Sequence, residues 1–228
     1  MKKLLMTVAL GVALTFAASA ENAFSNLFGT VRMEAGLKGI VTTGAGSAWS
    51  DDFDFPTNRD NVNFGGGFGL FGHAAFGSGS VRYMNQLEVN LLFNDGIGNS
   101  ITNFFDGDDE KGYLSVLTLD IPLLFGDDID VGKIVLSPFI GPVLSVPLTG
   151  TATFAGKDYD LSCKGVNFGG TVGLGVGIPV GPGQIAIDAR YAYDFTETKM
   201  KVEDLDGTQT LYRRGGIQVS LGYKTQLK

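Results

Sequence analysis

The chain has 228 residues, a formal net charge of −7, 34 glycines and a single cysteine. The acidic balance argues against nucleic acid as a partner, because surfaces that bind nucleic acid are basic. With only Cys163 available, no disulfide can form within the chain, so the fold must be stabilised by its own packing and hydrogen bonds.

The first twenty residues have the pattern of a secretory signal peptide. Lys2 and Lys3 make the start basic, an apolar run follows, and Ala18-Ser19-Ala20 is a cleavage site of the A-x-A type. The run is shorter than the roughly 20 residues that a membrane-spanning helix needs. We therefore expect a signal peptide over 1–20 and one domain over 21–228, whose net charge without Lys2 and Lys3 is −9.

Eight later segments alternate between apolar residues and polar or small ones, as strands with two differently solvated faces do. The clearest is 185–195, where Ile187 and Tyr191 share one face and Asp188 and Arg190 share the other. Each segment is long enough to cross a bilayer at a tilt. The eight expected strands are 31–41, 64–76, 81–93, 113–125, 134–146, 166–180, 185–195 and 217–227.

The connections between these strands alternate in length. Three are short and contain glycine, at 77–80, 126–133 and 181–184, and four are long and polar, at 44–61, 94–112, 148–165 and 196–212. Short turns on one side and long loops on the other are typical of outer-membrane barrels. The pattern predicts an all-β fold, an eight-stranded antiparallel up-and-down transmembrane β-barrel with both termini on the periplasmic side.

Alternation alone leaves open which face points outward, since a soluble ligand-binding barrel would hide its apolar face inside. The interior of eight strands is too narrow for roughly forty large apolar side chains. The polar face is rich in glycine, which suits a crowded interior. If Phe76 pairs with Val81 and Val180 with Ile185, then Glu88 lies opposite Gly69 and Arg190 opposite Gly175. A register slip of two would change these partners and keep long polar side chains facing glycines.

Charged residues on the polar face are therefore expected inside the barrel, where they must form pairs to be tolerated. This expected interior charge network comprises Arg32, Glu34, Lys38, Arg82, Glu88, Asp120, Asp188, Arg190 and Lys224.

Three stretches resemble the small bacterial outer-membrane β-barrel proteins of the porin-family or OmpA/OmpX-like type. They are Tyr113-Leu114 with Ile121-Pro122-Leu123-Leu124, then Pro138-Phe139-Ile140-Gly141-Pro142, and the closing strand from Arg214 to Lys224. The resemblance implies integral insertion in the outer membrane of a Gram-negative cell, contact with lipopolysaccharide and delivery by the outer-membrane assembly machinery. The chain departs from the family at its end, where Gln226-Leu227-Lys228 replaces the usual terminal aromatic residue.

Three features could mark a dinucleotide site, a catalytic histidine or a Ca²⁺ site, but each has a structural explanation. The G-x-G-x-x-G letters at 67–72 lie inside an alternating strand, whereas a dinucleotide site needs a strand before and a helix after. His73, the only histidine, has no serine two residues away and is expected inside the barrel near its periplasmic end. Acidic runs at 51–54 and 106–110 could hold Ca²⁺ but lack EF-hand spacing.

These observations predict a non-enzymatic integral outer-membrane protein without catalytic, cofactor or metal residues. Its loops would serve envelope-structural or adhesion and contact roles. The alternative function is a narrow porin-like channel for small solutes or hydrophobic compounds, although a crowded interior disfavours a wide pore.

Overall fold

The computed structural model describes residues 30–49, 63–94, 113–154, 157–202 and 209–227. The expected signal peptide over 1–20 and the acidic runs at 51–54 and 106–110 lie outside the described residues. No helix among the described residues is long and apolar enough to cross a membrane.

Ten strands form in the described part of the chain, and all their pairings are antiparallel. Eight of them close a barrel in the order β1, β2, β3, β4, β5, β7, β8, β10, with β10 returning to β1. The eight are β1 (Val31–Trp49), β2 (Asn63–Phe76), β3 (Val81–Asn94), β4 (Tyr113–Val131), β5 (Ile134–Phe154), β7 (Asn167–Val180), β8 (Gly183–Asp194) and β10 (Gln209–Gln226). The predicted eight-stranded up-and-down barrel is confirmed.

The two remaining strands extend the wall at one end of the barrel. β6 (Lys157–Lys164) pairs with β5 and β9, and β9 (Thr198–Val202) pairs with β6 and β10. β6 leads into β7 through Gly165, whose φ of 135° favours glycine. β8 leads into β9 through a bend in which the backbone N–H groups of Phe195 and Thr196 donate to the Phe168 carbonyl.

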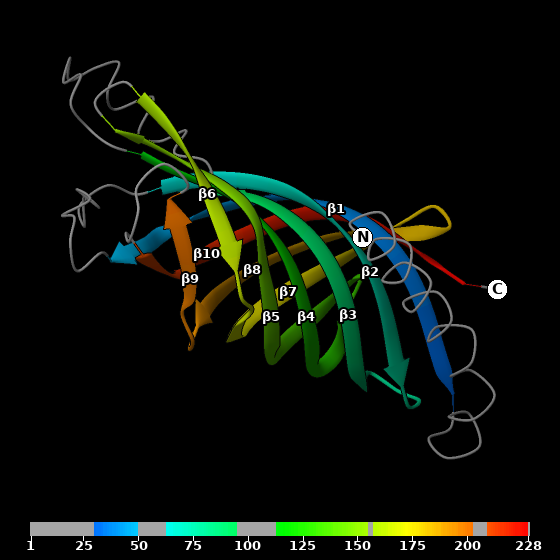
Figure 1. Cartoon of the computed structure of the whole chain (residues 1–228). Coiled ribbons are helices and arrows are strands. Elements are labelled where there is room, and N and C mark those ends of the chain that lie inside the picture. Colours follow the sequence, from blue (N-terminus) through cyan, green and yellow to red (C-terminus); the bar gives the residue numbers. More distant parts are fainter. Residues whose placement is uncertain (1–29, 50–62, 95–112, 155–156, 203–208, 228) are drawn as a thin grey trace.

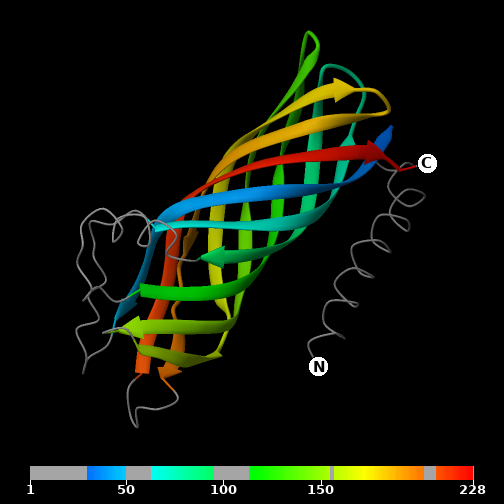
Figure 2. The ribbon, with the colours of Figure 1, turned by 90° about the horizontal axis from the view of Figure 1, so that it is seen from above.

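The ends of the strands define two ends of the molecule. The turns between β2 and β3, β4 and β5, and β7 and β8 gather at one end, which we call the turn end (upper right in Figure 2). β1 begins and β10 finishes there as well, and β6 and β9 lie toward the opposite loop end (Figure 1). Glycines with positive φ form the turns, at Gly77 and Gly79, at Gly132 and at Gly181.

The long loops expected at 148–165 and 196–212 are partly wrong. The first contains the end of β5 and all of β6, and the second contains β9 and the start of β10. Likewise β4 continues to Val131, so the turn expected at 126–133 shrinks to Gly132 and Lys133. These polar stretches stay in strands because their backbone groups find partners on neighbouring strands, a long-range pairing that local composition does not reveal.

Two hairpins are each shifted by two residues from the register considered above. Phe76 pairs with Tyr83 rather than Val81, and Val180 pairs with Gly183 rather than Ile185. Because side chains alternate with a period of two, a shift of two keeps every residue on its expected face. The partners do change, since Glu88 lies opposite Phe71 and Arg190 lies opposite Gly173.

β5 carries three prolines, which remove backbone donors from its ladder. Pro138 and Pro142 lie on the outer face, and Pro147 lies where the pairing with β4 shifts register, leaving Leu148 as an extra residue. A bulge at this position accommodates a residue that cannot donate, and it bends the strand.

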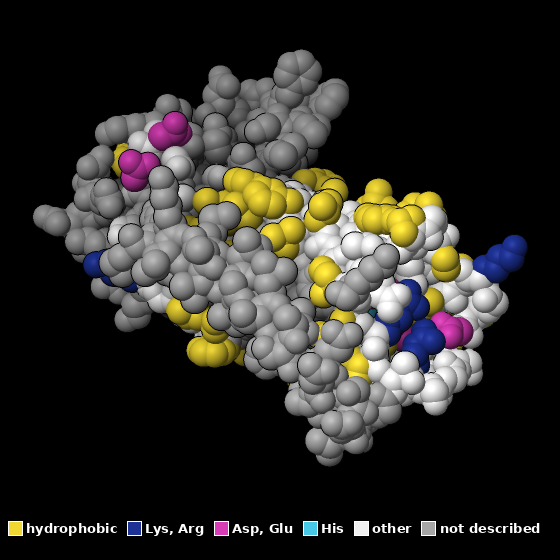
Figure 3. Space-filling model, turned by 90° about the vertical axis from the view of Figure 1, so that its right-hand side faces the viewer, with side chains coloured by type: hydrophobic (Ala, Val, Ile, Leu, Met, Phe, Trp, Pro, Cys, Tyr) yellow, Lys and Arg dark blue, Asp and Glu magenta, His cyan; other side chains and the backbone are white. Residues whose placement is uncertain are grey.

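The barrel exposes apolar side chains and buries charged ones, which is the reverse of a soluble protein. Leu37 on β1 is 64% exposed, whereas Glu88 on β3 is 0% exposed and faces the lumen. Seen from the right-hand side of Figure 1, hydrophobic side chains cover parts of the outside, and basic and acidic side chains gather beside one another (Figure 3). The exposed apolar side chains include Leu37, Val41, Phe68, Leu70, Val172, Leu174, Ile217, Val219 and Leu221.

Candidate functional site

A compact group of four charged side chains occupies the middle of the lumen. We call it the central cluster: Lys38 from β1, Glu88 from β3, and Asp188 and Arg190 from β8. Lys38 Nζ lies 2.8 Å from Glu88 Oε2 and 3.5 Å from Asp188 Oδ2. The four charges sum to zero, which is the condition under which buried ions are tolerated.

The guanidinium of Arg190 links the two carboxylates of the cluster. Its Nη1 and Nη2 donate to the two Glu88 oxygens at 2.8 and 2.9 Å, and its Nε donates to Asp188 Oδ1 at 2.7 Å. This fork geometry is the strongest pairing available to an arginine. β3 and β8 are separated by three strands in either direction around the barrel, so the pair spans the lumen.

Neutral side chains complete the hydrogen bonding of the cluster. Asn90 Nδ2 donates to Glu88 Oε2 at 2.9 Å, and Gln86 Nε2 donates to Glu88 Oε1 at 2.6 Å. The hydroxyl of Ser220 on β10 donates to Asp188. Glu88 therefore accepts from four donor side chains, which offsets the cost of burying its charge completely.

Glycines make room for the large side chains of the cluster. Lys38 lies between Gly69 on β2 and Gly222 on β10. A Cβ atom on Gly173 would lie 2.8 Å from the Arg190 Cβ and 2.6 Å from the ring of Phe139. That ring carries the Arg190 guanidinium 5.1 Å from its centroid, within the range of a cation–π contact.

A second polar group lies nearer the turn end and we call it the turn-end cluster: Arg32, Glu34, His73, Asp128, Ser137 and Lys224. Glu34 Oε2 lies 2.7 Å from Lys224 Nζ, and its Oε1 lies 2.6 Å from Arg32 Nη2. His73 Nε2 lies 2.9 Å from Asp128 Oδ2, and Ser137 donates to Asp128 Oδ1 at 2.6 Å. Gln86 joins the two clusters, because its Oε1 lies 3.1 Å from His73 Nδ1.

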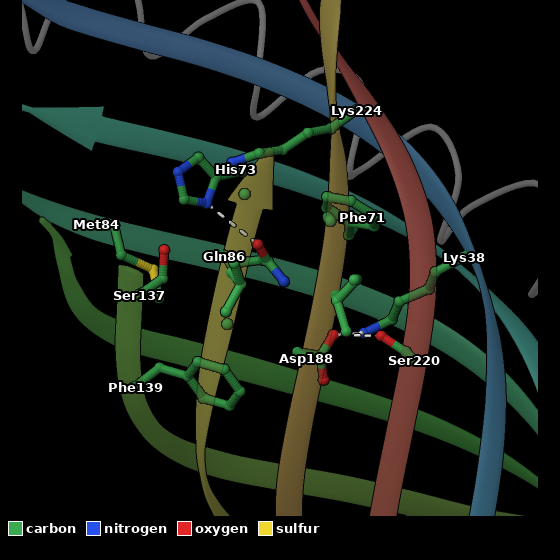
Figure 4. A pocket seen from close by; sticks show the side chains of 15 residues that line it. Lys38, Phe71, His73, Met84, Gln86, Ser137, Phe139, Asp188, Ser220 and Lys224 are labelled. Carbon is green, nitrogen blue, oxygen red and sulfur yellow. Dashed lines mark hydrogen bonds and ion pairs between the residues drawn. The ribbon is translucent and has the colours of Figure 1, made fainter. Parts of the chain in front are cut away.

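A cavity of about 40 Å³ lies between the two clusters (Figure 4). Its walls carry Lys38, Asp188 and Ser220 from one side and His73, Gln86, Ser137 and Lys224 from the other, with Phe71, Met84 and Phe139 as apolar patches. A buried water needs roughly 10–15 Å³ of such space, so the cavity has room for about three waters. Binding pockets for organic ligands are of the order of 300 Å³ or more, so this cavity suits water instead.

The arrangement around His73 lacks the contact that nucleophilic catalysis requires. In a serine-based site the hydroxyl hydrogen-bonds to the imidazole, which acts as its base. Here the Ser137 hydroxyl donates to Asp128, and both ring nitrogens of His73 face Asp128 and Gln86. Among the described residues, this His-Asp-Ser group is arranged as a structural network.

The structure places the nine residues of the expected charge network in four groups. Lys38, Glu88, Asp188 and Arg190 form the central cluster, and Arg32, Glu34 and Lys224 join the turn-end cluster. Arg82 pairs with Asp130 at the turn-end rim, with contacts of 2.7 and 2.8 Å. Asp120 is buried on β4, opposite Asn90 on β3.

The sequence does not predict several members of the two clusters. Asp128 falls in the expected turn at 126–133, although it continues the alternation of Thr118 and Asp120 on an extended strand. Gln86 and Asn90 are uncharged and gave no signal beyond lying on the polar face. His73 lies inside the barrel on the side of the turn end, where the sequence predicted it.

No family model matches the chain, and no curated protein matches its sequence. Among solved structures, it is similar to a major outer membrane protein from Thermus thermophilus, with 12% identity, a TM-score of 0.52, and coverage of 87% of this chain and 100% of that chain. It is also similar to the outer membrane protein OprG from Pseudomonas aeruginosa, with 14% identity, a TM-score of 0.49, and coverage of 86% and 97%. Neisserial surface protein A gives 14% identity, a TM-score of 0.38, and coverage of 86% and 97%.

At these identities the likeness concerns the fold alone, and it rests here on the Thermus protein, with its TM-score of 0.52. The chain therefore has the fold of a small outer-membrane β-barrel, as the resemblance in its sequence predicted.

Proposed function

We propose that this protein is an integral outer-membrane protein whose barrel is a sealed, non-enzymatic membrane anchor, and whose loop end carries a contact role in the envelope or in adhesion. The observation that carries the proposal is the central cluster, in which Arg190 and Glu88 connect opposite walls of the lumen. The outer membrane, with its lipopolysaccharide, would surround the exposed apolar side chains of the barrel wall, and the assembly machinery of that membrane would insert the barrel.

The cost of opening the central cluster supports a sealed lumen. A permeating ion would have to separate Glu88 from Lys38 and Arg190, and each of these side chains is at least nine-tenths buried. Removing one partner of a buried ion pair leaves the other charge uncompensated, which costs several kcal/mol. A barrier of this kind is incompatible with a steadily open pore.

The loop end supports a contact role. There the wall continues through β5, β6, β9 and β10, beyond the level at which β7 and β8 end. Asp158, Asp160 and Lys164 on β6 are exposed, in contrast to the apolar outer face of the barrel wall below them. These exposed charges on the extended part of the wall offer a polar surface to a partner.

A narrow channel is the second candidate, and the cavity between the two clusters favours it. This cavity already provides a polar space inside the lumen, lined by Lys38, His73 and Lys224. A channel would need only the central cluster to open. The two functions therefore differ in whether that cluster stays closed.

Single-channel recording in a planar bilayer separates the two functions. We expect no steady conductance from the purified wild-type protein, and discrete openings from the variant Glu88→Ala, which removes the residue that ties β1, β3 and β8 together. The matched control is Asp130→Ala, which removes a carboxylate from the partly exposed pair at the rim. Steady openings of the wild-type protein would overturn the sealed anchor in favour of the channel.

A further inference from the structure

The pairing of β4 with both of its neighbours is interrupted, whereas the other ladders among the described strands run without a break. Figure 1 shows β3, β4 and β5 side by side in the barrel wall. Toward β3 the paired positions of β4 skip Pro122, and between β4 and β5 they skip Pro138 and Pro142. Proline has no backbone N–H, so each of these residues removes one donor from a ladder. The interruptions of the wall therefore all involve β4 and coincide with prolines.

Two glycines allow β4 and β5 to approach closely where these donors are missing. We call the contact between the two strands the seam. A Cβ atom on Gly141 of β5 would collide with the carbonyl oxygen of Leu123, and one on Gly126 of β4 would collide with that of Pro138. The glycine Cα atoms thus face carbonyl oxygens, and Cα–H···O contacts are weaker than N–H···O hydrogen bonds. The seam is therefore held more by close packing than by its ladder.

Both faces of the seam are apolar. On the lumen side, Met84, Leu124 and Phe139 from β3, β4 and β5 form a buried hydrophobic group, which we call the apolar patch. On the outer side, Ile140 is 64% exposed and Leu123 is 38% exposed. Parting two strands in hydrocarbon is costly where backbone N–H and C=O groups lose each other as partners. The seam has fewer such pairs to lose, and the side chains that would meet lipid are apolar.

We propose that β4 and β5 part locally between Pro138 and Pro142 while the other ladders stay closed, so that hydrocarbon of the bilayer reaches the apolar patch. Met84 and Phe139 also line the cavity between the two polar clusters, so the opening leads from the bilayer toward that cavity (Figure 4). The opening is directed sideways, whereas the proposed seal at the central cluster concerns the route along the barrel axis. Steady conductance of the wild-type protein would refute the seal and leave the seam untouched, so the two failures are distinguishable.

Contacts between lumen methyl groups and lipid test the opening in the wild-type protein. We would label the leucine methyl groups and record nuclear Overhauser cross-peaks to acyl-chain protons in lipid nanodiscs. Leu124 in the apolar patch is expected to give such a cross-peak, as Leu221 on the outer face should. Leu92 is the matched control, because it is also 0% exposed but lies beside unbroken stretches of its two ladders, and it should give none. Absence of the Leu124 cross-peak would overturn the proposal.

Two neighbouring substitutions should change the opening in opposite directions. Pro142→Ala supplies a backbone N–H to the seam and should weaken or abolish the Leu124 cross-peak. Gly141→Ala places a methyl group against the Leu123 carbonyl and should strengthen the cross-peak. The control Pro179→Ala lies in the unbroken ladder between β7 and β8 and should leave it unchanged. If Gly141→Ala does not fold, the proline variants decide, since equal cross-peaks in Pro142→Ala and Pro179→Ala would also overturn the proposal.

Discussion

Arg190 on β8 reaches across the lumen to Glu88 on β3, 102 positions earlier in the chain, and donates to both of its carboxylate oxygens at 2.8 and 2.9 Å. The pair connects two strands that share no ladder and lie on opposite sides of the barrel. It therefore ties opposite walls of the barrel together. Lys38 and Asp188 balance its charges, so the cluster as a whole carries no net charge.

The contribution of the Arg190–Glu88 pair to the stability of the barrel can be measured with the isosteric variant Glu88→Gln. It should destabilise the barrel by roughly 3–5 kcal/mol, because Arg190 and Lys38 then remain buried with Asp188 as their only carboxylate in the cluster. Urea unfolding in lipid vesicles, followed by circular dichroism, gives the free energy of unfolding.

The control for Glu88→Gln is Asp130→Asn in the partly exposed pair with Arg82, where about 0–1 kcal/mol is expected. If Glu88→Gln and Asp130→Asn lowered the free energy of unfolding equally, the central cluster would stabilise the barrel no more than the partly exposed pair does.

The depth of the membrane can be probed with two valines of matched exposure. Val219 in the outer row of β10 is 47% exposed, and Val131 at the turn end of β4 is 48% exposed. Val219→Arg should cost roughly 2–4 kcal/mol in a bilayer, since hydrocarbon surrounds it, whereas Val131→Arg near the interface should cost about 0–1 kcal/mol. The same unfolding experiment measures both. Similar costs at the two positions would argue against a bilayer around β10.

Replacing a glycine by alanine should have different effects on stability in the lumen and on the outer face. Gly173→Ala should destabilise the barrel by about 1–3 kcal/mol, because the added methyl group would overlap the Phe139 ring and the Arg190 side chain. Gly39→Ala on the outer face meets nothing within 4 Å and should leave the free energy of unfolding unchanged or slightly higher. If Gly173→Ala left the free energy of unfolding unchanged, the space beside Arg190 and Phe139 would be large enough for an added methyl group.

The period of two in side-chain direction explains how much of this architecture could be predicted from the sequence. The alternation places Lys38, Glu88 and Arg190 on the polar face, and the small volume of an eight-stranded interior turns that face inward. A two-residue register shift, as seen in both hairpins, leaves every residue on its face. The partners of each charge depend on register and on which strands face each other across the lumen. The alternation of side chains gives neither the register nor the strands that face each other, so the pairing of Arg190 with Glu88 could not be derived from the sequence.

The strand ends were harder to predict than the strand faces. The short glycine-containing link at 126–133 predicts a turn that includes Asp128, whereas β4 runs to Val131 and Asp128 contacts His73. The polar residues of β6 and β9 predict loops, but these segments form strands by pairing with each other and with β5 and β10. In both cases tertiary pairing overrides local composition.

Fractionation of cells that express the protein tests directly whether lipid, rather than a dry protein core, covers the exposed rows of Leu, Val, Ile and Phe. The expressed protein should remain in the outer-membrane fraction after a high-salt or carbonate wash, and should migrate faster on a gel when unheated than when boiled, as a closed barrel does. Recovery of the folded protein from the aqueous fraction without detergent, with one migration position before and after boiling, would contradict the account.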